Sequence, residues 1–198
     1  AARANGIVGV LVRGAVYALD AASGQTRWRR FVGYETDVFP QSITNDGTND
    51  LLLVSGSFGE LQRVDAESGD LRWRLPCPAP IRTPRIFGDR AFVTCGRDGE
   101  SRLLAIELAT GKVTAEVRVP VGCSVEPTVI DDRNELIQPG SHSSIYVLDL
   151  ASLKCKRVFA SRHTRGSLTV PATWAGNALV FAVNNGTSGS LLHAFTPV

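Results

Sequence analysis

Apolar residues alternate with polar ones over short runs, and Gly, Pro, Asn or Asp interrupts these runs about every 8–12 residues. This pattern is typical of an all-β protein with tight turns. Sustained runs with the 3.6-residue period of amphipathic helices are nearly absent. The clearest predicted strands are residues 8–12, 51–54, 91–94 and 179–183. No stretch has the composition of a linker, which favours one domain or one part of a domain.

The same unit recurs along the chain with a period of about 42–45 residues. An acidic residue that ends a predicted strand recurs as Asp20, Asp65, Glu107 and Asp149. A proline recurs with nearly the same spacing at Pro40, Pro84, Pro127 and Pro171. A glycine stands nine residues before the acidic position, or before Phe195 in a degenerate fifth copy, at Gly56, Gly140 and Gly186. A period of this size with four strands per unit is typical of propeller blades.

We therefore predict an all-β fold, a β-propeller of four-stranded antiparallel blades. Four to five blades are present, as part of a larger propeller of seven or eight blades. Residues 1–198 form a single partial propeller domain, and its repeat units are 1–35, 36–79, 80–122, 123–166 and 167–198. The first unit is expected to begin at its second strand, residues 7–12, and the last to hold three strands from Pro171 onward. Such a chain is an open arc, which implies missing blades or self-association.

Two of the markers have a physical role in the predicted blade. The carboxylate of Asp20 can accept hydrogen bonds from the backbone of the turn that follows it, and Gly24 supplies the positive φ of that turn. Proline cannot donate to a sheet, so the recurring prolines are expected on the innermost strand of each blade, which is an edge. Turns at residues 58–59, 98–99 and 185–186 are predicted between the second and third strands.

Residues 18–28, Ala-Leu-Asp-Ala-Ala-Ser-Gly-Gln-Thr-Arg-Trp, match the A-x-D-x-x-T/S-G-x-x-x-W tryptophan-docking pattern. Residues 64–73 match it again, with Arg63 in the alanine position. By these residues the chain resembles the PQQ-like (pyrroloquinoline-quinone-type) propeller repeat family, in its non-enzymatic branch. The resemblance implies that Trp28 and Trp73 lie on outermost strands and fix each blade to its neighbour by stacking.

The next two units depart from the docking pattern. Ala115 and Arg157 stand in the aligned tryptophan positions, and Leu153 replaces the turn glycine. The third and fourth blades are therefore expected to dock in another way.

The enzymatic branch of this family implies a quinone held against two adjacent cysteines, with a calcium ion and a carboxylate base. None of the four cysteines is adjacent to another: they are Cys77, Cys95, Cys123 and Cys155. Cys77 and Cys123 are predicted in connections between units, Cys95 in a buried strand and Cys155 on an outer strand, and their disulfide state stays open. Residues 45–50 fit a hairpin turn better than a calcium loop. We predict no catalytic, cofactor-binding or metal-binding residues and no cofactor.

The remaining chemical candidates favour structural roles. His142, His163 and His193 have no metal-ligand spacing, and residues 185–187 fit a turn better than a glycosylated loop. The basic stretches 27–30 and 72–74 fall on outer strands, and a net charge of +2 indicates no nucleic-acid partner. The longest apolar run, 178–183, is too short for a membrane helix, and the chain shows no apolar core of a signal peptide.

These observations favour a non-catalytic propeller scaffold that binds a protein or peptide partner through the loops that connect its blades. Two alternatives remain. One is a fragment of a PQQ-dependent quinoprotein oxidoreductase, and the other is a ligand-sensing extracytoplasmic domain of a signalling protein. The family resemblance also implies an extracytoplasmic location, either periplasmic or secreted.

Overall fold

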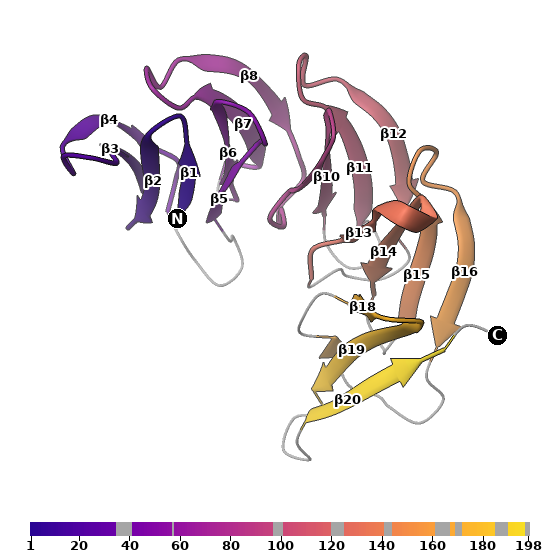
Figure 1. Ribbon diagram of the computed structural model, residues 1–198. Helices are drawn as coiled ribbons and strands as arrows, with labels where there is room; N and C mark the ends of the chain where they lie inside the picture. The colour runs from indigo at the N-terminus through magenta and orange to yellow at the C-terminus, as the bar shows by residue number, and fades with distance from the viewer. Residues whose placement is uncertain are drawn as a thin grey trace.

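The computed structural model describes residues 1–34, 41–56, 58–96, 101–119, 125–140, 144–160, 167–168, 172–184 and 190–196. They form five antiparallel sheets, which follow one another along an open arc (Figure 1). The first and fifth sheets lie at opposite ends of this arc. Each sheet is one blade, and the all-β propeller architecture predicted from the sequence is confirmed.

In each of the first four blades, the strands lie in chain order from the concave to the convex side of the arc (Figure 1). The first blade contains β1 (Ala2–Ala4), β2 (Ile7–Val12), β3 (Ala15–Asp20) and β4 (Thr26–Phe31). The second contains β5 (Gln41–Asn45), β6 (Asp50–Ser55), β7 (Glu60–Asp65) and β8 (Leu71–Pro76). The third contains β9 (Arg85–Phe87), β10 (Arg90–Cys95), β11 (Arg102–Glu107) and β12 (Val113–Arg118). The fourth contains β13 (Thr128–Ile130), the 3-10 helix η1 (Asp131–Arg133), β14 (Glu135–Pro139), β15 (Ser144–Asp149) and β16 (Cys155–Ala160).

The fifth blade contains β17 (Ser167–Leu168), β18 (Thr173–Ala175), β19 (Ala178–Asn184) and β20 (Ser190–Phe195). β17 and β18 both pair with β19, along the edge that β20 leaves uncovered. They are therefore two pieces of one interrupted inner strand, and the described blade has three strand positions, as expected. The inner strand begins before Pro171, which itself lies outside the described residues.

The expectation that the first unit begins at its second strand is wrong. β1 precedes β2 and pairs with it in antiparallel register, so the first blade has four strands. Asn5 and Gly6 form the turn between them, with φ of 45° and 72°. Positive φ at both residues is the geometry of a two-residue type I′ hairpin, for which Asn-Gly is the strongest sequence signal. The strand escaped prediction because no proline marks it.

The sequence markers occupy defined places in the blades. The carboxylates of Asp20, Asp65 and Asp149 accept hydrogen bonds from backbone N–H groups of the turns that follow them, at 2.7 to 3.1 Å. A hydrogen bond from the Arg27 side chain, together with those of the turn, holds the pKa of Asp20 well below its usual range. Pro84 stands immediately before β9, and Pro127 immediately before β13. These two prolines therefore precede the innermost strands and do not lie inside them, contrary to expectation. Pro40 and the turns predicted at 98–99 and 185–186 lie outside the described residues.

Tryptophan joins the first three blades, as the family resemblance implied. The indole nitrogen of Trp28, on the outermost strand β4, donates to the carbonyl of Ala66 in the second blade at 2.8 Å. The indole nitrogen of Trp73, on β8, donates to the carbonyl of Leu108 in the third blade at 2.7 Å. Each acceptor lies in the turn between the last two strands of the next blade.

Both rings also lie against a glycine of the turn that they bind. A Cβ atom at Gly69 would stand 2.8 Å from the Trp28 ring, and one at Gly111 would stand 2.7 Å from the Trp73 ring. Both glycines have positive φ, 77° and 72°. The docking pattern therefore needs glycine for two reasons, the left-handed backbone and the close approach of the indole.

At the interface of the third and fourth blades, the position of the large side chain holds a small one, and the position of the small side chain holds a large one. Ala115 replaces the tryptophan of β12, and Leu153 replaces the glycine of the following turn with φ of 58°. The side chain of Leu153 is 1% exposed, in a buried cluster that also includes Leu148 and Leu150 and against which Ala115 packs. Leucine accepts the left-handed backbone because its burial compensates for the strain.

Removing either docking tryptophan should destabilise the chain. Trp28→Ala or Trp73→Ala is expected to lower the free energy of unfolding by about 3–5 kcal/mol, the range for aromatic side chains cut back to alanine, because each half-buried ring packs against the next blade. Arg29→Ala, an exposed position on the same strand as Trp28, should cost less than about 0.5 kcal/mol. Denaturant midpoints of the three variants measure this difference, and equal losses would contradict the assigned interface.

The third interface should accept the tryptophan–glycine pair only when both positions change. Leu153→Gly alone is expected to cost about 2–4 kcal/mol because it leaves a cavity. Ala115→Trp alone should cost more than Leu153→Gly, beyond the usual overpacking penalty of about 1–3 kcal/mol, because an indole ring and Leu153 cannot occupy the same space. The double variant should regain more than about 1 kcal/mol relative to the sum of the two losses. Additive losses in a denaturant titration would show that the two positions do not share one space.

Candidate protein-binding surface

Turns between second and third strands and connections between blades lie at one end of the blades, because adjacent strands are antiparallel. We call this end the connection face. Its described residues include 13–14, 32–34, 58–59, 77–84, 96, 119 and 140. The opposite end carries the turns that receive the tryptophans. The connection face is thus the part of the propeller that blade docking leaves available.

Three exposed aromatic side chains gather on the connection face at the junction of the first two blades. Phe31, Tyr34 and Phe58 are 50%, 74% and 56% exposed. The Phe31 ring meets the Tyr34 ring edge to face with 5.3 Å between centroids, and the Phe58 ring with 5.9 Å. We call these three residues the aromatic patch. Contiguous exposed aromatic groups are unusual on a protein surface and mark places where partners bind.

The local fold explains how the aromatic patch is held. Phe31 is the last residue of β4 and pairs with Ala15, which in turn pairs with Val12 on β2. Val12 is also exposed, and it extends the apolar surface on the same face of the sheet. Phe58 reaches the same place from the turn between β6 and β7 of the next blade. The patch therefore bridges two blades whose relative position is fixed by Trp28.

The sequence contained a signal for the aromatic patch that the search for catalytic motifs missed. In the repeat alignment Phe31 corresponds to Pro76 and Arg118, which are both exposed. An aromatic residue therefore stands at a position that faces solvent in these repeats as well. Phe58 corresponds to Arg13 of the first unit, which is charged. Phe58 thus stands at a position that is charged in the first unit, and Phe31 at one that is exposed in the second and third units. Aromatic residues at such positions indicate binding, since the core does not use them.

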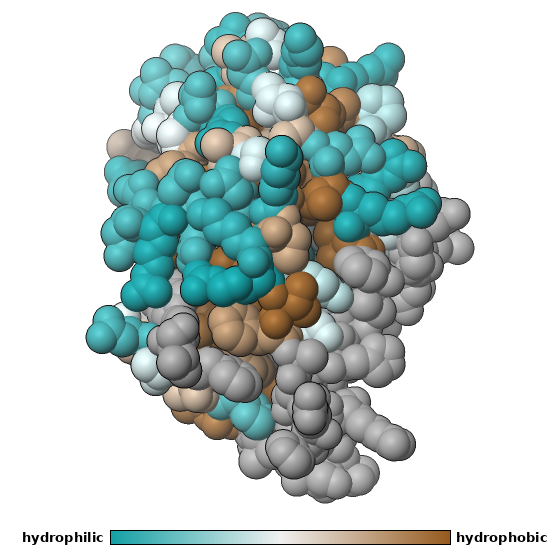
Figure 2. Space-filling model, turned by 90° about the vertical axis from the view of Figure 1, so that its right-hand side faces the viewer, coloured by the Kyte–Doolittle hydropathy of each residue, from teal (hydrophilic) through white to brown (hydrophobic). Residues whose placement is uncertain are grey.

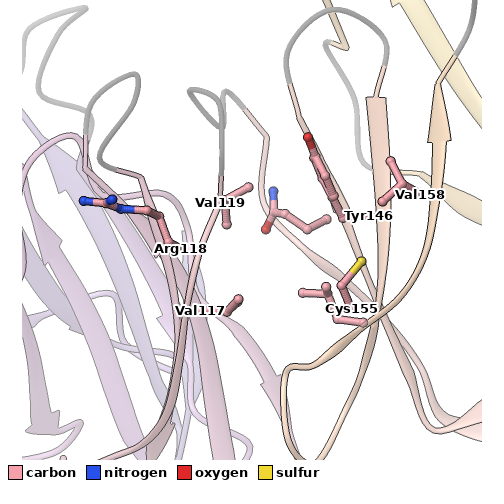
Figure 3. Close-up of a pocket in the computed structure, with 8 residues that line it drawn as sticks. Val117, Arg118, Val119, Tyr146, Cys155 and Val158 are labelled. Carbon is pink, nitrogen blue, oxygen red and sulfur yellow. The ribbon is translucent and has the colours of Figure 1, made fainter.

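A second candidate site is an apolar pocket of about 150 Å³ between the third and fourth blades. Figure 3 shows Val117, Arg118 and Val119 on one side of it and Tyr146, Cys155 and Val158 on the other, and Gln138 and Leu148 complete the lining. Figure 2 views the molecule from the side of Figure 1 on which β12 and β16 lie, and hydrophobic residues show there within a mostly hydrophilic surface.

The pocket lies at an interface that has no docking tryptophan. Ala115 stands two residues before Val117 on the same face of β12, in the position that Trp73 occupies one blade earlier. Val117 lines the pocket, whereas Ala115 packs against the cluster that includes Leu153. A space of this size and polarity suits a molecule the size of a benzene ring.

Of the cysteines, Cys95 is buried at the end of β10, Cys77 is buried just after β8, and Cys155 lies exposed on β16, all as predicted. All three are free thiols. Cys123 lies outside the described residues, as do His142, His163 and residues 185–187. His193 is on β20 and stacks on Phe181, with 5.3 Å between ring centroids.

The turn between β5 and β6 lies within residues 45–50, as predicted. The guanidinium group of Arg63 lies 2.7 Å from the carboxylate of Asp46 and 3.0 Å from that of Asp50, so both acids already share an internal cation. The same guanidinium donates to the Leu108 carbonyl at 2.7 Å and adds to the docking of the third blade. Within the part of the chain that the structure describes, no three His, Cys, Asp or Glu side chains gather to hold a metal ion.

The basic stretches have structural partners. Arg27 and Arg72 pair with the anchor carboxylates Asp20 and Asp65, and Arg30 donates to the carbonyl of Gly69 at 2.7 Å. They lie on the outer strands β4 and β8, as predicted. Among the described residues, no helix has both the length and the apolar character needed to cross a membrane.

The chain is similar in fold to solved structures of two other proteins. BamB from Moraxella catarrhalis superimposes with a TM-score of 0.69 at 22% identity, over 96% of this chain and 54% of that one. The computationally designed Ika8 protein superimposes with a TM-score of 0.74 at 13% identity, over 98% of this chain and 56% of Ika8. The chain thus spans about half the length of both, and these likenesses show the fold.

The sequence is similar to one related protein and to one family model. Serine/threonine-protein kinase AfsK of Streptomyces griseus is 28% identical over 163 residues, which are 79% of this chain but 19% of the kinase. A family model described as outer membrane protein assembly factor BamB matches residues 12–185. Since that match covers most of the chain and includes both tryptophan-docking segments, the chain belongs to this family of PQQ-like propeller repeats.

Proposed function

We propose that the chain is a propeller scaffold that binds a protein partner at the aromatic patch of its connection face. The observation that carries the proposal is the contact of Phe31, Tyr34 and Phe58, three exposed rings that converge from two blades. Aromatic side chains at the centre of a surface patch supply much of the energy of protein–protein binding. Membership of a family described as an assembly factor supports a role in protein interaction.

The composition of the patch defines the partner's chemistry. Its three rings and the neighbouring Val12 offer apolar surface, and the only polar group among the four side chains is the Tyr34 hydroxyl. A matching segment therefore presents apolar side chains to the rings and places polar groups at the rim, where these groups stay hydrated. We infer a partner peptide or loop that is rich in leucine or aromatic residues.

A second candidate function is the sensing of a small apolar ligand. The pocket between the third and fourth blades supports it, because its lining is apolar and Val158 at its edge is exposed. The similarity to a serine/threonine-protein kinase gives this pocket a signalling context, since a propeller linked to a kinase can report ligand binding to it. The quinoprotein alternative rests on the family resemblance alone.

An extracytoplasmic location is part of the proposal. It rests on the family, whose description names outer-membrane protein assembly. A peripheral propeller of this kind would meet its partner on the periplasmic or outer side of a membrane.

The aromatic patch can be tested by selecting binding peptides from a displayed random library. Peptides that bind the wild-type chain are expected to be rich in apolar residues. Phe31→Ser or Phe58→Ser should weaken their binding at least about tenfold, as measured by calorimetry.

Leu71→Ser is the matched control, since Leu71 is an exposed apolar residue on β8 outside the patch. It should leave the affinity of the peptides unchanged. Peptides that bind all the variants alike, or a library that yields no binder, would contradict the proposed surface.

The apolar pocket can be tested with indole as a probe. Saturable binding is expected, with changes in the NMR signals of Val117 and Tyr146, which line the pocket. Cys155→Trp should abolish the binding by filling the pocket, and the fold should tolerate it because Cys155 is exposed. Binding that survives Cys155→Trp, or shifts confined to other blades, would refute the ligand site.

A further inference from the structure

Two cysteines lie together at the interface of the second and third blades. Cys77 is the first residue after β8, and Cys95 is the last residue of β10. Their side chains are 2% and 1% exposed, and both belong to one buried cluster that joins the two blades. The remaining described cysteine, Cys155, lies on β16 and is exposed.

Main-chain hydrogen bonds hold the two cysteines side by side. The backbone N–H of Gly96 donates to the carbonyls of Pro78 and Pro80, at 2.9 and 3.0 Å. Pro78 follows Cys77 directly and Gly96 follows Cys95 directly, so these bonds bring the two chain segments into register. A bridge between Ile81 and Cys95 extends the same contact.

The repeat gives independent evidence that these two positions touch. Val32 in the first blade corresponds to Cys77, because the backbone N–H of each donates to the equivalent turn of its own blade at 2.8 and 2.7 Å. Ser55, the last residue of β6, corresponds to Cys95, the last residue of β10. At the first interface, the Ser55 hydroxyl donates to the Val32 carbonyl.

The same pair of positions is therefore in contact at successive interfaces, but its chemistry changes. It is valine and serine at the first interface, and cysteine and cysteine at the second. At the third interface the corresponding residues are Val119 and Gly140. Thiols stand at both positions only at the second interface. A hydrogen bond with Cys95, together with burial, also raises the pKa of the Cys77 thiol, as expected for two thiols in contact.

We propose that Cys77 and Cys95 form a disulfide that joins the second and third blades when the protein is in oxidising surroundings. The oxidant is a small-molecule disulfide. One cysteine loses its proton and attacks it, releasing one small thiol and forming a mixed disulfide. The second thiolate then attacks the mixed disulfide at the cysteine sulfur, releasing the second small thiol. The two cysteines lose two electrons, which the small-molecule disulfide gains.

The cross-link would act at the end of the interface opposite to Trp73. Trp73 docks on the turn at Leu108, whereas Cys77 begins the connection that leads along the connection face to the third blade. With the disulfide closed, both ends of this interface are fixed, and the segment 77–95 becomes a covalent loop. Oxidation therefore stabilises the blade pair and the backbone of the connection face beside it.

The proposal is tested on the full 198-residue chain, fully reduced and then equilibrated with oxidised glutathione. After denaturation in excess alkylating reagent, two of the four cysteines should be alkylated, and a peptide map should join Cys77 to Cys95. The oxidised chain should unfold at a temperature about 5–10 °C above that of the reduced chain, as a loop of this length predicts.

Cys77→Ala and Cys95→Ala should each abolish the difference between the oxidised and reduced unfolding temperatures, whereas the matched variant Cys155→Ala should keep it. If a variant does not fold, the peptide map of the wild-type chain still decides the pairing. Four alkylated cysteines after oxidation would overturn the proposal. A map that joins another pair, or a temperature difference that persists in Cys77→Ala, would overturn it equally.

Discussion

The close contact between an indole ring and a glycine of the next blade is the constraint on which the other features depend. The contact works only because the turn beneath the ring is rigid. The Asp65 carboxylate accepts two backbone hydrogen bonds of that turn, which fixes both the Gly69 surface and the Ala66 carbonyl that Trp28 binds. A local hydrogen-bond motif within one blade thus becomes the docking site for its neighbour. Each blade must present one such turn to the preceding tryptophan, and the docking pattern therefore recurs with the period of the blades.

The two ends of each interface have separate tasks. At the end that carries the turns between third and fourth strands, which we call the turn end, a tryptophan or leucine side chain sets the distance between blades. At the connection end, contacts between equivalent residues vary from hydroxyl–carbonyl, at Ser55 and Val32, to thiol–thiol, at Cys77 and Cys95. Because tryptophan docking uses only the turn end, exposed residues of the connection face can change without loss of that contact. The aromatic patch is such a change, and it uses positions that lie outside the core.

Much of the fold could be predicted from the sequence because each blade repeats the same physical solution. The period and the turn geometry followed from residue type and spacing, and the outer-strand position of Trp28 was implied by the family resemblance. β1 could not be predicted from the proline marker, although the Asn5-Gly6 dipeptide carried a local signal. The fit of Leu153 in place of an indole depends on Ala115, 38 residues earlier in the sequence, so no local pattern reports it. The aromatic patch was missed because its rings meet only after two blades have docked.

The exchange at Ala115 and Leu153 also limits the evolutionary paths between repeats of this kind. Starting from the tryptophan–glycine pair, a first change of glycine to leucine would drive the new side chain into the ring, since even a Cβ atom there stands within 2.8 Å of it. A first change of tryptophan to alanine leaves a cavity, which weakens the interface but permits it to form. The leucine then restores packing. Repeats with alanine and glycine at these two positions are therefore the expected evolutionary intermediates, whereas repeats with tryptophan and leucine together should be absent.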